Sequence, residues 1–377
     1  MLLTPEAQNV NKLIEKHLST MPFYIQEYIR AKKRSGLSPN TLLQYLYRYI
    51  HFLNWLLREA IVDVESIDKI PLSSLENLKK TEVELYIEYL REEEIPAEKN
   101  AKKHRGDQVV FLSVQSLKSL FNYLTKETET TDGECYFYRN VMSKIVLLTK
   151  KETANRRAEK ISSVILNEEE IDDFLFFVEN GYEHTLSNKL SRQRFLRDKE
   201  RDKAILSLML GSGIRVKEAT QLELKKINLT KNKIGITRKG NGEDTVGVLD
   251  SAMQDLKRYL DIRKERYPGA VDSPFCFITD YKGIRPLSSR AVQKLVHKYT
   301  GAFSSDKGIS PHKLRHSFAA DYIRKGGELI LLKGQMGHRN IETTTLYTNL
   351  SSKENQVILD RMDESRRSQS DIHKETE

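Results

Sequence analysis

The segment Ser310–Ala319 reads Ser-Pro-His-Lys-Leu-Arg-His-Ser-Phe-Ala, and the expected fold and chemistry are built outward from it. A serine followed by a proline is a frequent helix start, with the serine as N-cap and the proline in the first turn. The sequence therefore predicts a helix that begins at this pair and runs to about Lys325. Residues three and four apart share one face of a helix, so His312, Arg315 and His316 project together.

This helix face combines two kinds of side chain that suit one reaction. An imidazole can carry a proton near neutral pH, and a guanidinium can grip two oxygens of one phosphate group. Two histidines four residues apart, here His312 and His316, can also bind zinc. However, Arg315 lies between them, and neither a carboxylate nor a third histidine is near in sequence. The pattern therefore favours a phosphate site over a metal site.

A glycine turn upstream carries a second arginine. Gly-Ser-Gly at 211–213 ends a helix predicted over 201–210, and Arg215 follows at the start of the next helix. Free backbone N–H groups at a helix start attract anions, and Glu218, one turn further on, can orient the arginine. Taken singly, such an arginine is more often solvated or salt-bridged than functional. The turn therefore indicates a functional site only in combination with the other segments.

A predicted hairpin supplies a lysine. Strand composition at 233–237 and 245–249 flanks Arg-Lys-Gly-Asn-Gly at 238–242, and the Asn-Gly pair is a strong turn signal. Lys239 lies in this turn. A lysine in an exposed turn can donate a proton to a leaving group if the turn reaches a substrate.

The last segments are Met336–Arg339, which contains His338, and Thr343–Tyr347. Tyr347 is one of seventeen tyrosines and would carry little weight alone. Together the segments provide what is needed to move a phosphodiester without metal, ATP or another cofactor. Arginines neutralise the phosphoryl charge, a histidine takes the phenolic proton, and a lysine protonates the leaving oxygen. The tyrosine would be the covalent nucleophile.

The order and spacing of these segments resemble the tyrosine recombinases of the phage integrase family. Similarity lies in GSGIRVKE at 211–218, HKLRHSFA at 312–319 and MGHRNIETTTLY at 336–347. The resemblance implies that Tyr347 is the nucleophile and that Glu218 and His316 support the site. The residues it implies for phosphate and proton roles are Arg215, Lys239, His312, Arg315 and His338.

Further strings resemble the Xer branch of this family in which one recombinase acts alone. They are MPFYIQEY at 21–28, PLSSLENL at 71–78, YFYRNVM at 136–142, KKET at 150–153 with RAE at 157–159, and DKERD at 198–202. One departure is visible in the hairpin turn, where Lys239–Glu243 lacks the second basic residue that many relatives carry. This departure weakens any second phosphate contact there and leaves the mechanism intact.

The chain is expected to be mainly α-helical with two domains. Helical patterns begin at Ser38-Pro39, at a capping box of Thr81 and Glu84, before an apolar stripe at 110–124, and at a cap of Asn167 and Glu170 that opens the second domain. The resemblance implies a helical, SAM-like core-binding domain and a mostly helical catalytic domain with a small antiparallel sheet. The predicted boundaries are 1–147 for the DNA-binding domain, 148–165 for a linker, 166–355 for the catalytic domain and 356–377 for a C-terminal helix and tail.

Charge and composition point to a polyanionic partner. Sixty-two Lys and Arg against fifty-three Asp and Glu leave a net charge of +9 over 377 residues. Such an excess is often gathered on one surface that binds nucleic acid. Basic clusters before two predicted helices are candidate phosphate contacts, although each cluster taken singly is more often a solvated loop. The candidates are Lys32, Lys33, Arg34, Lys102, Lys103 and Arg105.

The remaining composition limits the compartment. Two separated cysteines, Cys135 and Cys276, argue against a disulfide framework or a structural zinc site. No apolar stretch is long enough to span a membrane, and the amino terminus lacks the features of a signal peptide. The expected location is therefore the cytoplasm, with no membrane partner.

The resemblance also implies partners and a biological role. It implies duplex DNA with an inverted-repeat recombination site, a homotetramer on two such sites, and resolution of chromosome dimers at a dif-like site before cell division, with a septal DNA translocase as partner. Alternatives are the integrase or excisionase of a mobile element and a type IB topoisomerase. A non-catalytic architectural DNA-binding protein would predict eroded catalytic positions, whereas all six are present.

Overall fold

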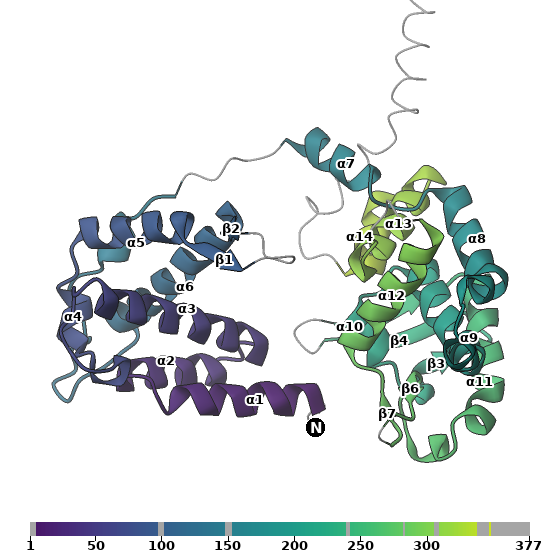
Figure 1. Cartoon of the computed structure of the whole chain (residues 1–377), viewed down its shortest axis with the longest axis horizontal. Helices are drawn as coiled ribbons and strands as arrows, with labels where there is room; N and C mark the ends of the chain where they lie inside the picture. The colour runs from purple at the N-terminus through teal and green to yellow at the C-terminus, as the bar shows by residue number, and fades with distance from the viewer. Residues whose placement is uncertain are drawn as a thin grey trace, which may run out of the picture. The chain divides into compact units, whose positions relative to one another are not determined.

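The computed structural model describes residues 5–96, 102–147, 153–238, 242–281, 283–304, 309–337 and 347. The chain forms two compact units, Met1–Lys151 and Glu152–Glu377 (Figure 1). Both are built mainly from α-helices, and each has small antiparallel sheets, which confirms the predicted fold class. No described helix is both long and apolar enough to cross a membrane.

The first unit packs its helices around one apolar core. Its helices are α1 (Pro5–Leu18), α2 (Phe23–Arg34), α3 (Pro39–Arg58), α4 (Leu72–Glu76), α5 (Lys80–Glu92) and α6 (Asp107–Lys126), with short 3₁₀ turns η1 (Ile67–Lys69) and η3 (Val141–Lys144). A two-stranded hairpin of β1 (Glu94–Pro96) and β2 (Lys102–His104) separates α5 from α6. The apolar stripe predicted at 110–124 is buried along α6.

Local sequence accounts for two helix starts in this unit, one predicted correctly and one not. The hydroxyl of Ser38 accepts a hydrogen bond from the N–H of Thr41 at 3.3 Å, which caps α3 as expected. The capping box predicted at Thr81 is wrong. The N–H of Lys79 donates to Oε2 of Glu82 at 2.7 Å, so α5 begins at Lys80 and Thr81 lies inside it. A glutamate in the first turn can therefore fix a helix start without a capping hydroxyl.

Buried tyrosines tie the helices of the first unit together. Tyr49 and Tyr24 are fully buried and donate to the carbonyls of Ser116 and Ile70, at 2.9 and 3.2 Å. These contacts join α3 to α6 and α2 to the segment before α4. A buried phenol needs such a partner, because a hydroxyl transferred from water without a hydrogen bond costs free energy.

The candidate basic residues of the first unit lie on different elements, and Arg105 lies in the segment between β2 and α6, before a helix as predicted. Lys32, Lys33 and Arg34 form the last turn of α2, while Lys102 and Lys103 lie on β2.

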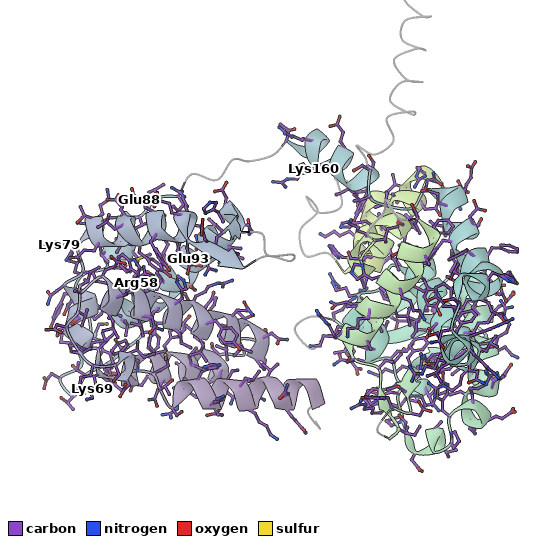
Figure 2. The ribbon with its side chains drawn as sticks, viewed as in Figure 1. Arg58, Lys69, Lys79, Glu88, Glu93 and Lys160 are labelled. Carbon is purple, nitrogen blue, oxygen red and sulfur yellow. The ribbon has the colours of Figure 1, made fainter. Side chains whose placement is uncertain are left out.

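Three of these basic side chains also form ion pairs with carboxylates, and the partner of Lys33 is Glu15 at 3.5 Å. Nζ of Lys32 lies 2.7 Å from Glu127, and the guanidinium of Arg105 lies 2.7 Å from Glu93. Figure 2 labels Glu93 directly after α5.

The second unit begins with α7 (Ala154–Ser162), which is capped by Thr153 and lies in the segment predicted as a linker. Its other helices are α8 (Glu168–Phe176), α9 (Lys189–Ser212), α10 (Val216–Thr220), α11 (Asp250–Arg266), α12 (Ser289–Phe303), α13 (Pro311–Arg324) and α14 (Leu329–Met336), with short helical turns η4 (Phe177–Gly181), η5 (Tyr182–Thr185), η6 (Leu224–Lys226) and η7 (Ala270–Asp272). The predicted cap of α8 by Asn167 and Glu170 is confirmed.

A three-stranded antiparallel sheet holds the hairpin. It has the order β3 (Ile227–Asn228), β4 (Lys233–Thr237) and β5 (Glu243–Gly247), and a second pair is formed by β6 (Ile278–Thr279) and β7 (Arg285–Pro286). β4 has the predicted bounds, whereas β5 begins two residues earlier than predicted. The N–H of Arg238 donates to the carbonyl of Gly242 at 2.8 Å, so strand pairing resumes immediately at Glu243.

Candidate active site

The glycine turn after α9 is required by its backbone and by its neighbours. Gly213 adopts a φ of +67°, and a Cβ added there would lie 2.3 Å from the ring of Phe318. Only glycine adopts such a conformation without strain while leaving room for this ring. The carbonyl of Gly213 faces α13 and accepts a hydrogen bond from Arg315 at 2.5 Å. The turn thus joins the two predicted arginine segments.

Arg215 is held by a buried carboxylate. It is the N-cap residue of α10, and its N–H donates to Oε2 of Glu218 at 2.8 Å while its guanidinium donates to Oε1 at 2.9 Å. A further bond of 3.2 Å reaches the carbonyl of Gly337. Glu218 is 3% exposed, whereas the Arg215 side chain is 33% exposed. The carboxylate therefore orients a guanidinium that still reaches solvent, as the sequence predicted.

Arg315 is a buried cation whose hydrogen bonding is incomplete. It is 1% exposed and donates to the carbonyls of Gly213 and Met336, each at 2.5 Å, while its Nε has no partner. Among the described residues no carboxylate forms an ion pair with it. Burial, and next the charge of Arg215, lower the pKa of Arg315 to about 10, so it stays charged at neutral pH. An anion is the partner that this group lacks.

The first turns of α13 place the two histidines together. The helix begins at Pro311 after Ser310, as predicted, and the rings of His312 and His316 meet edge to face with centroids 4.5 Å apart. Burial lowers the pKa of His312, and the charges of Arg315 and Arg215 lower it further. His312 is therefore neutral at neutral pH and able to accept a proton.

Tyr347 reaches the same helix. Its hydroxyl lies 2.6 Å from Nδ1 of His316, and its side chain is 1% exposed. The ring belongs to a small apolar cluster with Phe318, Ala319, Leu332 and Met336. Burial raises the pKa of Tyr347 to about 12, although the positive charge of Arg315 opposes the rise. The phenol is therefore protonated at neutral pH and must lose its proton to a base before it can act as a nucleophile.

Six of the eight predicted site residues thus belong to one cluster. Glu218 holds Arg215, and the Arg215 and Arg315 charges both lower the pKa of His312. His312 contacts His316. Tyr347 is a sixth member through His316. Lys239 and His338 lie outside the described residues, as do residues 356–377.

Sequence reasoning missed Arg238, which precedes Lys239 in sequence and contacts this cluster. Its guanidinium lies 3.4 Å from Oε2 of Glu218 and donates to carbonyls at the end of α14. The available signal was its place next to a candidate catalytic lysine at the end of a strand. A single basic residue at a turn gave no reason to expect a contact with a helix almost a hundred residues away.

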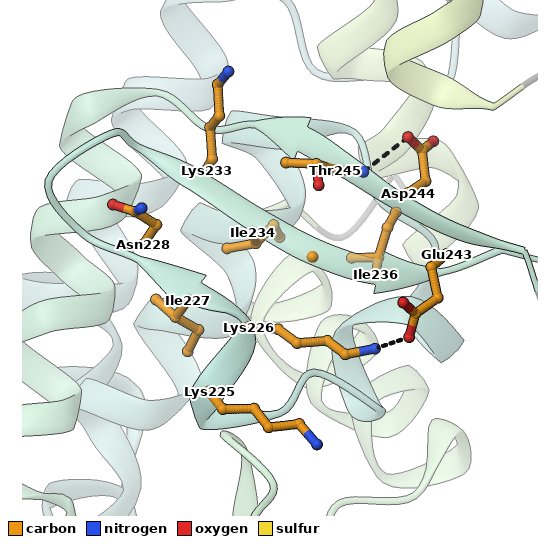
Figure 3. A pocket seen from close by; sticks show the side chains of 11 residues that line it. Lys225, Lys226, Ile227, Asn228, Lys233, Ile234, Ile236, Glu243, Asp244 and Thr245 are labelled. Atoms are coloured by element: carbon orange, nitrogen blue, oxygen red, sulfur yellow. Dashed lines mark hydrogen bonds and ion pairs between the residues drawn. The ribbon is translucent and has the colours of Figure 1, made fainter.

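A groove of about 730 Å³ runs along the sheet beside the hairpin (Figure 3). Lys225, Lys226, Asn228 and Lys233 line it with residues of β4 and β5. Lys226 crosses to Glu243 at 2.7 Å, as the figure shows. Among the described residues there is no cluster of three or more His, Cys, Asp or Glu side chains that could hold a metal ion.

Comparison with known sequences gives the class of the protein. The model of the Phage integrase family matches residues 188–354. Tyrosine recombinase XerS of Lactococcus lactis subsp. lactis (strain IL1403) is 38% identical over 356 residues, covering 94% of this chain and 98% of that protein. The XerS of Streptococcus sanguinis (strain SK36) is 39% identical over 350 residues, covering 93% and 98%.

Solved structures show the same fold. A XerH site-specific recombinase bound to difH substrate superposes with a TM-score of 0.58 at 18% identity, covering 95% of this chain and 96% of that one. A lambda integrase dimer bound to a COC′ core site gives 0.52 at 14% identity, covering 87% and 95%.

The chain therefore belongs to the phage integrase family and is a tyrosine recombinase, an enzyme that exchanges DNA strands. Within that family it is an XerS-like site-specific recombinase, because its similarity to XerS proteins extends over nearly the whole length of both chains.

Proposed function

We propose that this recombinase cuts and rejoins duplex DNA at an inverted-repeat, dif-like site and so resolves chromosome dimers before cell division. The observation that carries its chemistry is Arg315, a buried cation with an unpaired Nε, in the same cluster as the buried phenol of Tyr347. A phosphodiester placed between these groups would supply the missing anion to the first and the electrophile to the second.

The proposed reaction has two stages. In cleavage, Oη of Tyr347 forms a bond to phosphorus, the bond from phosphorus to O5′ breaks with its electron pair going to O5′, and Lys239 gives that oxygen a proton. The product is a 3′-phosphotyrosyl linkage and a free 5′-hydroxyl. In rejoining, a 5′-hydroxyl attacks the same phosphorus and the tyrosine leaves, so no metal, ATP or other cofactor enters the balance.

The proposed roles follow from position in the cluster. Arg215 and Arg315 neutralise the charge on the phosphoryl oxygens, and Glu218 keeps Arg215 oriented. His316, expected only to support the site, holds the phenolic hydroxyl at 2.6 Å and is the first acceptor of its proton. His312 is a neutral neighbour of His316. It either takes the proton from His316 or contacts the phosphate. We assign His338 to the phosphate from the family pattern.

The biological role rests on the relatives. Similarity to XerS recombinases at 38–39% identity over nearly the whole chain favours a housekeeping Xer enzyme over the integrase of a mobile element. We propose a cytoplasmic enzyme that acts as a homotetramer on two sites, with a septal DNA translocase as partner. Its domains are the core-binding domain at 1–147, the linker at 148–165, the catalytic domain at 166–355 and the tail at 356–377.

A trapping experiment tests the proposed chemistry. Tyr347→Phe protein captures its binding site from genomic DNA, and the recovered duplex is then synthesised with a nick that prevents rejoining. Wild-type protein is expected to form a covalent protein–DNA adduct on this duplex, whereas Tyr347→Phe binds it and forms none. An adduct from the Phe variant would contradict the nucleophile assignment. Failure of two such sites on one plasmid to recombine would favour a topoisomerase.

A further inference from the structure

Arg238 makes an unusual set of contacts for a residue at the end of a strand. Its Nη2 donates to the carbonyls of Gln335 at 2.6 Å and Gly334 at 3.4 Å, and its Nη1 donates to the carbonyl of Met336 at 3.2 Å. These three carbonyls end α14, where the last carbonyls of a helix have no acceptor role in further helical turns; that of Gly334 also accepts from the N–H of Gly337, and that of Met336 from Arg315. A guanidinium is a good cap for them, because it has five donors in one plane and completes the negative end of the helix dipole.

The same guanidinium is fixed from the hairpin side. Its Nε donates to Oδ2 of Asp244 on β5 at 2.8 Å, and its Nη1 lies 3.4 Å from the buried carboxylate of Glu218. Only 12% of the Arg238 side chain is exposed. The group therefore joins three elements: the base of the hairpin, the carboxyl end of α14, and the carboxylate that orients Arg215.

The turn that follows α14 is shaped to this arginine. Gly337 has a φ of +60°, and a Cβ added there would lie 2.7 Å from Nε of Arg238. The guanidinium thus packs directly against the residue that precedes His338. On its own chain, Arg238 is adjacent to Lys239, and its N–H closes the turn on Gly242 at 2.8 Å. The Arg238 side chain thus links the hairpin segment that carries Lys239 to the end of α14, which precedes His338.

We propose that Arg238 is a positioning residue that fastens the base of the 238–242 turn to the carboxyl end of α14, and so sets where Lys239 meets the leaving oxygen. The inference rests on the proposed function, because it acts through the step in which Lys239 protonates O5′. Arg238 itself gives no proton, because its donors are engaged by Asp244, Glu218 and the carbonyls of α14. Its loss should therefore slow the departure of the leaving group while DNA binding is retained.

A sulfur substitution separates this role from a general loss of structure. In a duplex with a bridging 5′-thio linkage, the bond from phosphorus to sulfur breaks and a thiolate leaves without needing a proton, because thiols have pKa values near 8.5. Arg238→Ala should form the adduct about 10²-fold more slowly than wild type on the oxygen duplex, the order of loss expected when a catalytic group is misplaced. On the sulfur duplex the two proteins should differ by less than about threefold.

Three matched variants sharpen the result. Lys239→Ala is expected to show the same rescue by sulfur. Arg238→Lys keeps the charge but loses the planar fork, so it should be slowed to an intermediate extent and be rescued likewise. Glu243→Gln removes the exposed ion pair to Lys226 on the other side of the same hairpin and should cleave like wild type. Melting temperature and duplex affinity are measured for each protein.

The outcomes are distinct. Equal slowing of Arg238→Ala on oxygen and sulfur duplexes would overturn the proposal, as would wild-type cleavage by this variant. If Arg238→Ala does not fold, the comparison is made with Arg238→Lys, and the absence of rescue there overturns the proposal. Absence of any adduct from the wild-type protein would instead overturn the proposed function, and the role of Arg238 would fall with it.

Discussion

Arg215 and Arg315 would bind the same phosphate from very different surroundings. The Arg215 side chain is one-third exposed, whereas Arg315 is buried and donates hydrogen bonds to the carbonyls of Gly213 and Met336. Alanine variants of the two arginines should consequently differ in their free energy of unfolding. We propose a catalytic role for both, but only Arg315 is also part of the buried packing.

Substitution of either arginine by alanine should slow cleavage by about 10²-fold or more, because each removes a charged donor worth roughly 3 kcal/mol at the transition state. Arg315→Ala should in addition lower the free energy of unfolding by about 1–3 kcal/mol, since two buried carbonyls each lose a hydrogen bond. Single-turnover adduct formation and chemical denaturation measure the two effects. Unchanged cleavage would remove that arginine from the site.

His312 gives the reaction a predicted dependence on pH. Burial, with the charges of Arg315 and Arg215, lowers its pKa below the ordinary value of 6.5, so its neutral form persists to lower pH than in a free histidine. Cleavage should be steady around neutrality and fall only as the pH drops through this lowered pKa. A rate profile between about pH 5 and pH 8 measures it. If His312→Gln keeps the same acidic limb, a different group is titrating.

At the scale of elements, the parts predicted correctly are those determined by neighbours in sequence. The Ser-Pro starts of α3 and α13, the Asn167 cap of α8 and the bounds of β4 each depend on a few adjacent residues. The site residues on α13 could be placed on one face for the same reason.

The errors have tertiary causes. α9 begins at Lys189, twelve residues before the predicted start at Arg201, because its polar first half uses few apolar side chains and is held partly by ion pairs. Neither the contact of His316 with Tyr347 nor that of Arg238 with α14 has a local signature, since the partners are 31 and about a hundred residues apart.

The turn that ends α9 should be intolerant of a side chain. Gly213→Ala must accept a positive φ and displace the ring of Phe318, so we expect a loss of about 1–3 kcal/mol or more in the free energy of unfolding. Gly301→Ala is the matched control, because Gly301 lies in α12 with open space around its Cα. Denaturant unfolding compares them. Equal stability of the two variants would contradict this account of the turn.

At the scale of the whole molecule, net charge is a poor guide to which basic residues meet DNA. The excess of +9 fits a polyanionic partner, yet several of the candidate cations are engaged with carboxylates of their own unit. Arg105 shares Glu93 with His51 and Tyr89, and the side chains of Arg105 and Glu93 are only 23% and 22% exposed. Such a residue is part of the framework of the first unit.

Lys103→Ala and Arg105→Ala should therefore behave differently. Lys103→Ala should weaken binding to the same extent on every duplex sequence and reduce the slope of log K against log salt by about 1. Arg105→Ala should mainly lower the stability of the first unit, because Glu93 is left without its cation. Salt titrations of binding and thermal unfolding separate the two. A sequence-specific loss for Lys103→Ala would contradict a backbone contact.

The phenol of Tyr347 meets an imidazole of its own polypeptide. We therefore expect each subunit to cleave with its own tyrosine, so that a defect in one subunit is not compensated by its neighbour. Mixing a population that lacks the hydroxyl with one that lacks the Arg315 guanidinium would not restore scission through genetic complementation. In assemblies that mix intact and defective subunits, the strands that are cut would then identify the positions of the intact subunits.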